Sequence, residues 1–186
     1  MKDAAPTMVV LSEYRAPDWL VEHLDLRFEL DPGDTRVEAR IRVRRAEGTE
    51  PGVALRLHGQ ELKLLRLAIN GKEPEAGAVT ADGEGLLLAG LPDVAEITVQ
   101  TSIRPEANTA LEGLYVSGGS LCTQCEAEGF RRITYFPDRP DVLTRYRVRL
   151  EADAGRFPVL LANGNRVETG ALPGGRPYAV WEHPFP

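Results

Sequence analysis

The sequence predicts an all-β domain of the sandwich type. Three observations support this prediction: short segments in which apolar and polar residues alternate, turn-forming residues between those segments, and no long stretch with helical periodicity. The 18 glycines and 14 prolines fall mostly between the alternating segments, where they end strands. A length of 186 residues is enough to bury a sizeable core. We therefore expect residues 1–186 to form a single domain.

Two alternating segments near the N-terminus predict an antiparallel strand pair. His23–Leu30 carries its apolar residues at even positions, and Arg36–Arg44 carries them at odd positions. The turn-forming residues Asp31–Asp34 separate the two segments. One face of this pair should pack on the core and the other should face water. The arginines on the polar face are predicted to be solvated rather than to form an anion site: Arg36, Arg40, Arg42 and Arg44.

Further strands are predicted wherever the alternation or a short apolar run returns. They are Val53–Leu57, Leu62–Ile69, Gly85–Leu88, Ala95–Thr101, Leu143–Glu151, Phe157–Leu161 and Tyr178–Glu182. Two short segments have a helical appearance, Pro17–His23 and Asp138–Leu143. The expected fold therefore contains mostly antiparallel strands and little helix.

Composition and the N-terminus argue against several classes of partner. The net charge of −6 disfavours nucleic acid, since phosphate binding requires a basic face. Residues 1–6 lack the apolar run of a signal peptide, and no segment approaches the roughly 20 apolar residues of a membrane helix. Two cysteines are too few for a secreted disulfide scaffold. We expect a soluble, cytoplasmic protein without a membrane or nucleic-acid partner.

The two cysteines, Cys122 and Cys125, have the C-x-x-C spacing of some metal and redox sites. Zinc would require two more ligands, and the three histidines do not have ligand spacing. If the cysteines lie on a strand, their Cα atoms are roughly 10 Å apart, beyond the ~7 Å limit for a disulfide. We predict packing roles for both, with a metal or redox module as the alternative.

The same segment holds the candidate binding residues. On a strand over Leu121–Glu126, the side chains of Gln124 and Glu126 share one face, and glycines flank the strand on both sides. A glutamate on such a rigid element can hold a cation while the amide fixes its orientation. The alternative is an ordinary solvated face.

Nearby, Asp138, Arg139 and Asp141 surround two prolines and predict a charged turn with a helix N-cap. A local Asp–Arg pair there would brace the neighbouring loop. The sequence has no H-E-x-x-H motif, no phosphate-binding glycine loop and no G-x-S-x-G elbow, so we expect no catalytic residue in this chain.

Several long segments together resemble the N-terminal domain of bacterial aminopeptidase N, in the zinc-dependent gluzincin aminopeptidase family. The similarity covers nearly the whole chain and is weakest over residues 49–90. The segments that carry it are Tyr14–Asp18, Asn108–Tyr115, Leu121–Tyr135, Asp138–Leu143, Leu161–Val167 and Trp181–Pro186.

This resemblance implies a saddle-shaped β-sandwich that packs against a thermolysin-like catalytic domain. The family's zinc ligands and exopeptidase motif belong to that second domain, so this chain alone is expected to bind no metal and to be inactive. Glu126 matches the family glutamate that holds the substrate α-amino group, and Gln124 matches a residue of the pocket for the first side chain. Glutamate is ionised and a peptide α-amine is largely protonated at neutral pH, so the pair is charge-assisted.

The sequence is compatible with two hypotheses about the whole protein. In one, the polypeptide continues past Pro186 into a catalytic domain, and the enzyme releases N-terminal residues from peptides. In the other, a stand-alone β-sandwich serves as a binding or scaffold module without catalysis. The first also implies an apolar surface that the catalytic domain covers, so the isolated domain is expected to self-associate.

Overall fold

The computed structural model describes residues 10–186 and shows an all-β sandwich. Three short 3₁₀ turns are its only helical elements within that range: η1 (Leu11–Glu13), η2 (Pro105–Ala107) and η3 (Phe130–Arg132). A seven-stranded sheet forms one layer, in the order β11-β12-β10-β1-β2-β7-β4. Its strands are β1 (Trp19–Glu29), β2 (Thr35–Arg45), β4 (Lys63–Ile69), β7 (Val94–Ile103), β10 (Arg145–Glu151), β11 (Asn165–Ala171) and β12 (Pro177–His183).

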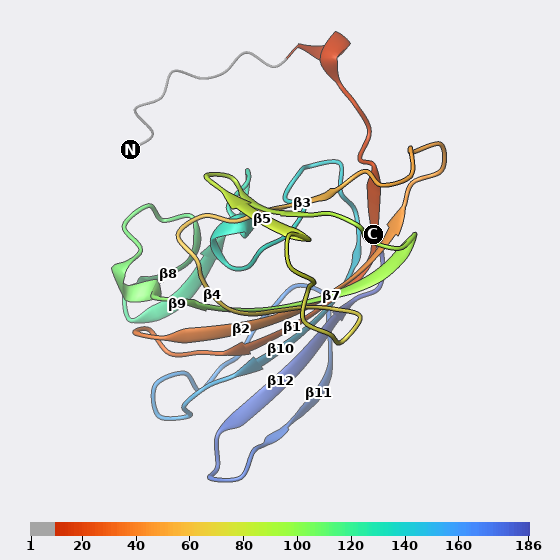
Figure 1. Cartoon of the computed structure of the whole chain (residues 1–186). Helices are drawn as coiled ribbons and strands as arrows, with labels where there is room; N and C mark the ends of the chain where they lie inside the picture. Colours follow the sequence, from red (N-terminus) through yellow and green to blue (C-terminus); the bar gives the residue numbers. More distant parts are fainter. Residues whose placement is uncertain (1–9) are drawn as a thin grey trace.

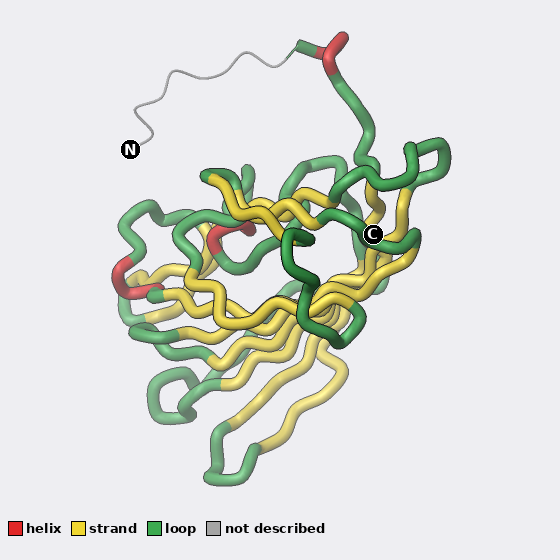
Figure 2. The backbone as a smooth tube through the Cα atoms, in the orientation of Figure 1, coloured by secondary structure: helices red, strands yellow, loops and turns green. Residues whose placement is uncertain are grey.

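Two smaller sheets complete the fold. A three-stranded sheet in the order β3-β6-β5 lies across one face of the large sheet (Figure 1). Its strands are β3 (Leu55–His58), β5 (Val79–Asp82) and β6 (Gly85–Leu88). A hairpin of β8 (Gly113–Ser117) and β9 (Ser120–Gln124) lies to one side. The tube in Figure 2 shows how little of the chain is helical and how long the loops between strands are.

The core fills the space between the large and the small sheet. Alternate residues of β1, β2 and β7 meet the inward residues of β3 and β6, and side chains such as Leu24, Ile41 and Leu57 are fully buried. Each such side chain contributes about 1.5–3 kcal/mol when it leaves water. The predicted pairing of the first two strands is confirmed, with Leu24 opposite Ile41 and Leu26 opposite Ala39.

The opposite face of the large sheet is charged and exposed, as predicted for the arginines of β2. These arginines pair with neighbouring carboxylates: Arg36 with Asp34, Arg40 with Glu38, and both Arg42 and Arg44 with Glu22. The pairs lie in water and make a small net contribution to stability.

The predicted helical segment at Pro17–His23 is wrong, because β1 already begins at Trp19. A β-bulge between Val21 and His23 inserts an extra residue. Before the bulge the inward residues have odd numbers, Trp19 and Val21; after it they have even numbers, starting with Leu24. This change of parity hides the strand from a search for regular alternation.

Other differences also have local causes. Phe157–Leu161 is a loop rather than a strand, and Pro158 inside it has no N–H for a ladder. Asp138–Leu143 forms a turn without a helix, with one hydrogen bond of 3.1 Å from Val142 to Arg139. The edge strand β11 has a fully exposed, largely polar sequence that gave no strand signal.

Candidate functional site

Three of the segments that carry the family resemblance lie side by side in the structure: Asn108–Tyr115, Leu121–Tyr135 and Asp138–Leu143. Gly113 of β8 is the cross-strand partner of Gln124 on β9, so the segments around residues 108–115 and 121–130 form one hairpin. Asp138, from the third segment, accepts hydrogen bonds from Arg131 directly after the hairpin. The fold therefore gathers these residues around the end of β9.

Glu126 lies on a turn and not on the strand itself. β9 ends at Gln124, and residues 126–129 form a turn that the Gly129 N–H closes with a 2.8 Å hydrogen bond to the Cys125 carbonyl. The predicted strand over Leu121–Glu126 is therefore two residues too long. Gln124 and Glu126 are linked in another way: the Gln124 side-chain amide donates a 2.9 Å hydrogen bond to the Glu126 carbonyl oxygen.

Both ends of this turn are anchored in the core. Cys125 on one side and Phe130 on the other pack against the buried cluster. Phe130 makes edge-to-face contacts with Phe136 and Tyr146, at centroid distances of 5.1 and 6.5 Å. Because the ends are fixed while the tip is exposed, the turn presents the Glu126 side chain to solvent from a rigid base.

The Glu126 carboxylate is free to meet a ligand. Within residues 10–186 it takes part in no ion pair or hydrogen bond. The neighbouring acids are engaged: Glu128 lies 3.4 Å from Arg131, and Asp138 lies 3.0 Å from the same guanidinium. Among the acids of this turn and the loop beside it, Glu126 is thus the one without a cation.

Close packing between glycines sets the position of the hairpin relative to the turn. A Cβ on Gly129 would lie 2.5 Å from the Gln124 carbonyl oxygen, and a Cβ on Gly113 would lie 2.7 Å from the Cβ of Arg132. Such distances are far shorter than a carbon contact allows. Gly113 also has a positive φ of 74°, which other residues rarely adopt. These two glycines let β8, β9 and η3 approach one another.

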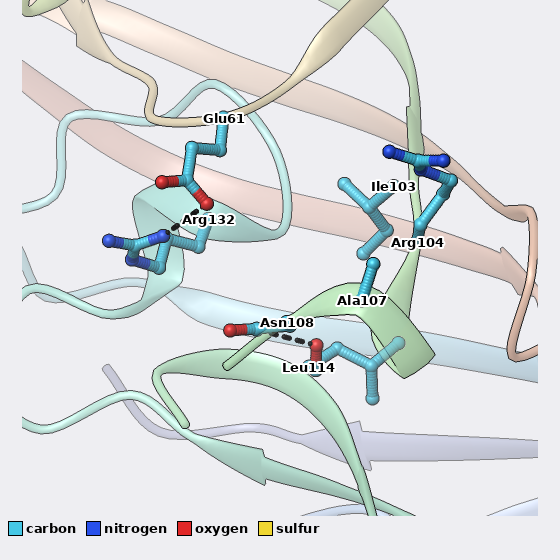
Figure 3. Close-up of a pocket in the computed structure, with 7 residues that line it drawn as sticks. All are labelled: Glu61, Ile103, Arg104, Ala107, Asn108, Leu114 and Arg132. Atoms are coloured by element: carbon cyan, nitrogen blue, oxygen red, sulfur yellow. Dashed lines mark hydrogen bonds and ion pairs between the residues drawn. The ribbon is translucent and has the colours of Figure 1, made fainter. Parts of the chain in front are cut away.

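Arg132 and Asn108 hold the other side of the hairpin (Figure 3). The Arg132 guanidinium is largely buried and pairs with Glu61 at 2.8 Å and with Glu112 at 3.2 Å. The Asn108 amide donates to the carbonyls of Glu112 and Leu114 at 2.7 and 2.9 Å. Arg132 and Asn108 border a cavity of about 280 Å³. Gln124 and Glu126 do not line this cavity, and its two wall residues Arg132 and Glu61 pair with each other.

The charged turn at residues 138–141 is present, and the predicted local Asp–Arg pair is confirmed: Arg139 pairs with Asp141 at 2.6 Å. Asp138 binds Arg131, which precedes the turn. Arg139 also donates a 2.7 Å hydrogen bond to the carbonyl of Arg15, which ties the N-terminal segment to this loop. No helix follows for an N-cap to begin.

Sequence reasoning missed Arg131, Arg132 and His58. The His58 Nδ1 accepts a 3.1 Å hydrogen bond from the Asp138 backbone N–H, across 80 residues of sequence. Burial, reinforced by the positive charge of Arg131, lowers the pKa of His58 below its ordinary value. A neutral imidazole is the form that accepts this bond. Nothing in the local sequence around His58 points to a partner so distant.

The cysteines are free thiols. Both are half-buried, and Cys125 packs against the core. Burial, with a smaller effect of the Asp138 charge, raises the pKa of the Cys125 thiol to about 11. Within residues 10–186, no group of three or more His, Cys, Asp or Glu side chains could hold a metal ion. The same part of the chain has no helix of the length and apolarity that crossing a membrane requires.

Comparison with known proteins identifies relatives over the whole chain. Residues 21–186 match the family model of the peptidase M1 N-terminal domain. Aminopeptidase N of Caulobacter vibrioides is 52% identical over all of this chain, and aminopeptidase N of Escherichia coli is 47% identical over 94% of it. The chain spans about a fifth of the length of these relatives, 21% and 20% respectively.

Solved structures give the same result. Aminopeptidase A of Legionella pneumophila, crystallised with aspartic acid, superposes with a TM-score of 0.86 at 31% identity, over 95% of this chain and 21% of that one. An M1 zinc metallopeptidase of Deinococcus radiodurans superposes with a TM-score of 0.72 at 15% identity, over 89% of this chain and 39% of that one. The second likeness shows a shared fold.

Proposed function

Because this chain belongs to the family of peptidase M1 N-terminal domains, we propose that it is the N-terminal domain of a zinc-dependent aminopeptidase that releases N-terminal residues from peptides. In this proposal Glu126 anchors the substrate's α-ammonium group, and Gln124 contributes to the pocket for the first side chain. The observation that carries the proposal is the Glu126 carboxylate, unpaired within residues 10–186 and exposed on a turn whose ends are anchored in the core.

The chemistry of an ammonium anchor fits this arrangement. A carboxylate that already has a cation gains little from a second one, whereas an unpaired carboxylate gains a charge-assisted hydrogen bond. The anchored turn limits the entropy lost when the carboxylate meets its ligand. A peptide with a blocked α-amine, or an internal peptide bond, offers no ammonium and is rejected.

The proposed zinc would be held by residues outside this chain. The described residues 10–186 have no suitable group of ligands, so no step of the reaction is assigned to a metal held here. Bound zinc would polarise the scissile carbonyl and supply activated water. The part of this chain is to bind and orient the peptide N-terminus. The two free thiols fit a reducing compartment, and we place the protein in the cytoplasm.

The test is Glu126→Ala in the full-length protein, measured with an aminoacyl p-nitroanilide whose α-amine is free. Loss of one charge-assisted contact should lower kcat/KM by about ten- to a hundredfold. Zinc content should not change, because Glu126 is not a ligand. Glu73→Ala, which removes an exposed carboxylate from the loop between β4 and β5, is the matched control. Unchanged kinetics in Glu126→Ala would refute the proposed role.

One end of the large sheet offers a surface that the rest of the polypeptide would cover. The start of β10, the end of β12 and the start of β11 lie at the same end of the large sheet. Large apolar side chains are exposed around this end: Leu143, Val159, Leu161 and Phe185. The β11 side of the sheet extends beyond the small sheet that covers the core (Figure 1). We propose that the catalytic domain packs here.

The same surface should make the isolated 186-residue chain self-associate. Sedimentation velocity over a concentration series should show the sedimentation coefficient rising with concentration. The double variant Leu161→Ser/Phe185→Ser should shift the chain toward monomer. A single monomeric species at all concentrations would contradict this part of the proposal.

A further inference from the structure

We infer that Arg131 and Asp138 form a positioning pair, which holds the turn from Cys125 to Gly129 so that the Glu126 carboxylate faces the substrate ammonium. The inference rests on the proposed function of Glu126. Neither residue of the pair touches the substrate in this proposal. Both act indirectly, by fixing the position of the turn and by changing the charge around it.

The pair is tightly joined. The Arg131 backbone N–H and its Nε both donate to Oδ2 of Asp138 at 3.0 Å, and the Arg131 Nη2 donates to the Asp138 carbonyl at 2.7 Å. Both side chains are mostly shielded from solvent, at 20% and 13% exposure. The two bonds from the guanidinium fix its orientation, and the bond from the backbone N–H holds the Asp138 carboxylate beside it. His58 extends this attachment into the small sheet, because its Nδ1 accepts from the Asp138 N–H.

The guanidinium also reaches the turn. Its Nη2 lies 3.4 Å from Oε1 of Glu128, two residues after Glu126. Glu128 has a φ of 67°, in the left-handed region that costs a side-chain-bearing residue about 1 kcal/mol or more. Contacts around the turn must therefore support this conformation. The Glu128–Arg131 pair is one such contact, and the hydrogen bond from Gly129 to Cys125 is another.

Charge gives the pair a second role. The turn carries two carboxylates, Glu126 and Glu128, at its exposed tip. Arg131 pairs with Glu128 as well as with Asp138, which leaves Glu126 as the carboxylate of the turn that has no cation when an ammonium arrives. Without Arg131, Glu128 would compete for the same cation from a different position, and the substrate would bind in more than one register.

The experiment uses the full-length protein and the same aminoacyl p-nitroanilide as above. A misplacement of about 1 Å at a reacting site can cost a hundredfold in rate, so Arg131→Ala should lower kcat/KM by about ten- to a hundredfold. Arg131→Lys should restore little, because an ammonium cannot reproduce the planar fork of donors. Arg139→Ala is the matched control, because Arg139 pairs with Asp141 and donates to the Arg15 carbonyl, and within residues 10–186 it makes no hydrogen bond or ion pair with the turn.

A double-mutant cycle separates positioning from general stability. If Arg131 acts through Glu126, the effect of Arg131→Ala should fall below about twofold in a Glu126→Ala background. An effect of the same size in both backgrounds would overturn the inference. The inference would also be overturned if Arg131→Ala kept full activity while Glu126→Ala impaired it. In both cases the proposed function would stand. If Glu126→Ala itself has no effect, the proposed function fails first.

If Arg131→Ala does not fold, Asp138→Asn provides the test. The asparagine oxygen can still accept from the Arg131 N–H, while the charge that orients the guanidinium is lost. We expect a severalfold decrease in kcat/KM that disappears in the Glu126→Ala background. An undiminished effect there would overturn the inference in the same way.

Discussion

Arg27 on β1 donates two hydrogen bonds, of 2.9 and 3.0 Å, to the carboxylate of Glu151 on β10, 124 residues later in the chain. Arg149 adds a third, of 2.6 Å. β1 and β10 form the one parallel pair among the described strands of the large sheet. The Glu151 side chain is 1% exposed, so this pair joins the two halves of the sheet through a buried carboxylate.

We predict that Glu151→Gln lowers the free energy of unfolding by about 1–3 kcal/mol. Burial opposes ionisation of Glu151, but the hydrogen bonds from Arg27 and Arg149 outweigh it and hold the pKa of the carboxyl below its ordinary value. That stabilisation is present above the ordinary pKa and is lost as pH falls through the lowered value. The difference between wild type and variant in urea denaturation should therefore shrink as the pH falls below about 4.5.

Arg40→Met is the control for this prediction. Arg40 forms a comparable pair with Glu38 at 2.8 Å, but Arg40 is mostly exposed. Its loss should change stability by less than about 1 kcal/mol. Equal effects of Glu151→Gln and Arg40→Met would show that burial does not distinguish the two pairs.

Asn108 should be needed for the conformation of the loop before β8. Its amide group donates to the carbonyls of Glu112 and Leu114, and its Oδ1 accepts from the Ala110 N–H. Asn108→Asp has the same shape but loses both donors and places a carboxylate against two carbonyl oxygens. We predict a loss of about 1–3 kcal/mol, at least as large as that of Asn108→Ala, by thermal or chemical denaturation. An Asn108→Asp variant as stable as the wild type would contradict the importance of these two bonds.

His58 should make stability depend on pH near neutrality. Its folded-state pKa lies below the ordinary value of 6.5, so the unfolded chain binds more protons between the two values. The stabilising contribution is complete above about pH 6.5 and is lost as the pH falls toward the folded-state pKa. His58→Asn keeps an acceptor for the Asp138 N–H but cannot titrate, and its stability should vary less between pH 5 and 6.5. An NMR titration of His58 with a midpoint at or above 6.5 would refute the prediction.

Cys125 should be a slow-reacting thiol. With a pKa of about 11, it holds roughly two hundredfold less thiolate at pH 8 than a free cysteine, whose pKa is about 8.5. In a Cys122→Ser variant, where Cys125 is the remaining thiol, alkylation by iodoacetamide should be slower than that of free cysteine by about that factor. Reaction at the rate of a free thiol would show that Cys125 is not held in the buried position.

Most of the strands could be predicted from the sequence, because a half-buried strand leaves a period-two pattern. The turn Asp31–Asp34 and the alternation on either side of it were sufficient for the β1–β2 pair, which the structure confirms. Prediction from this pattern failed where a bulge changes the parity of the inward residues, as after Val21 in β1. It also failed at β11, which has no buried face to leave a pattern.

The sequence by itself determined the all-β class and the solvated arginine face of β2, because each depends on residues that are close in the chain. It also predicted Gln124 and Glu126 as candidate binding residues. The tertiary structure decided the rest. It ends β9 at Gln124 and places Glu126 on a turn, it pairs Asp138 with Arg131 instead of the adjacent Arg139, and it brings His58 to the Asp138 backbone. These contacts depend on the directions of side chains and on strands that meet after long loops. Their energies become available only when the core has formed, and no local pattern in the sequence records them.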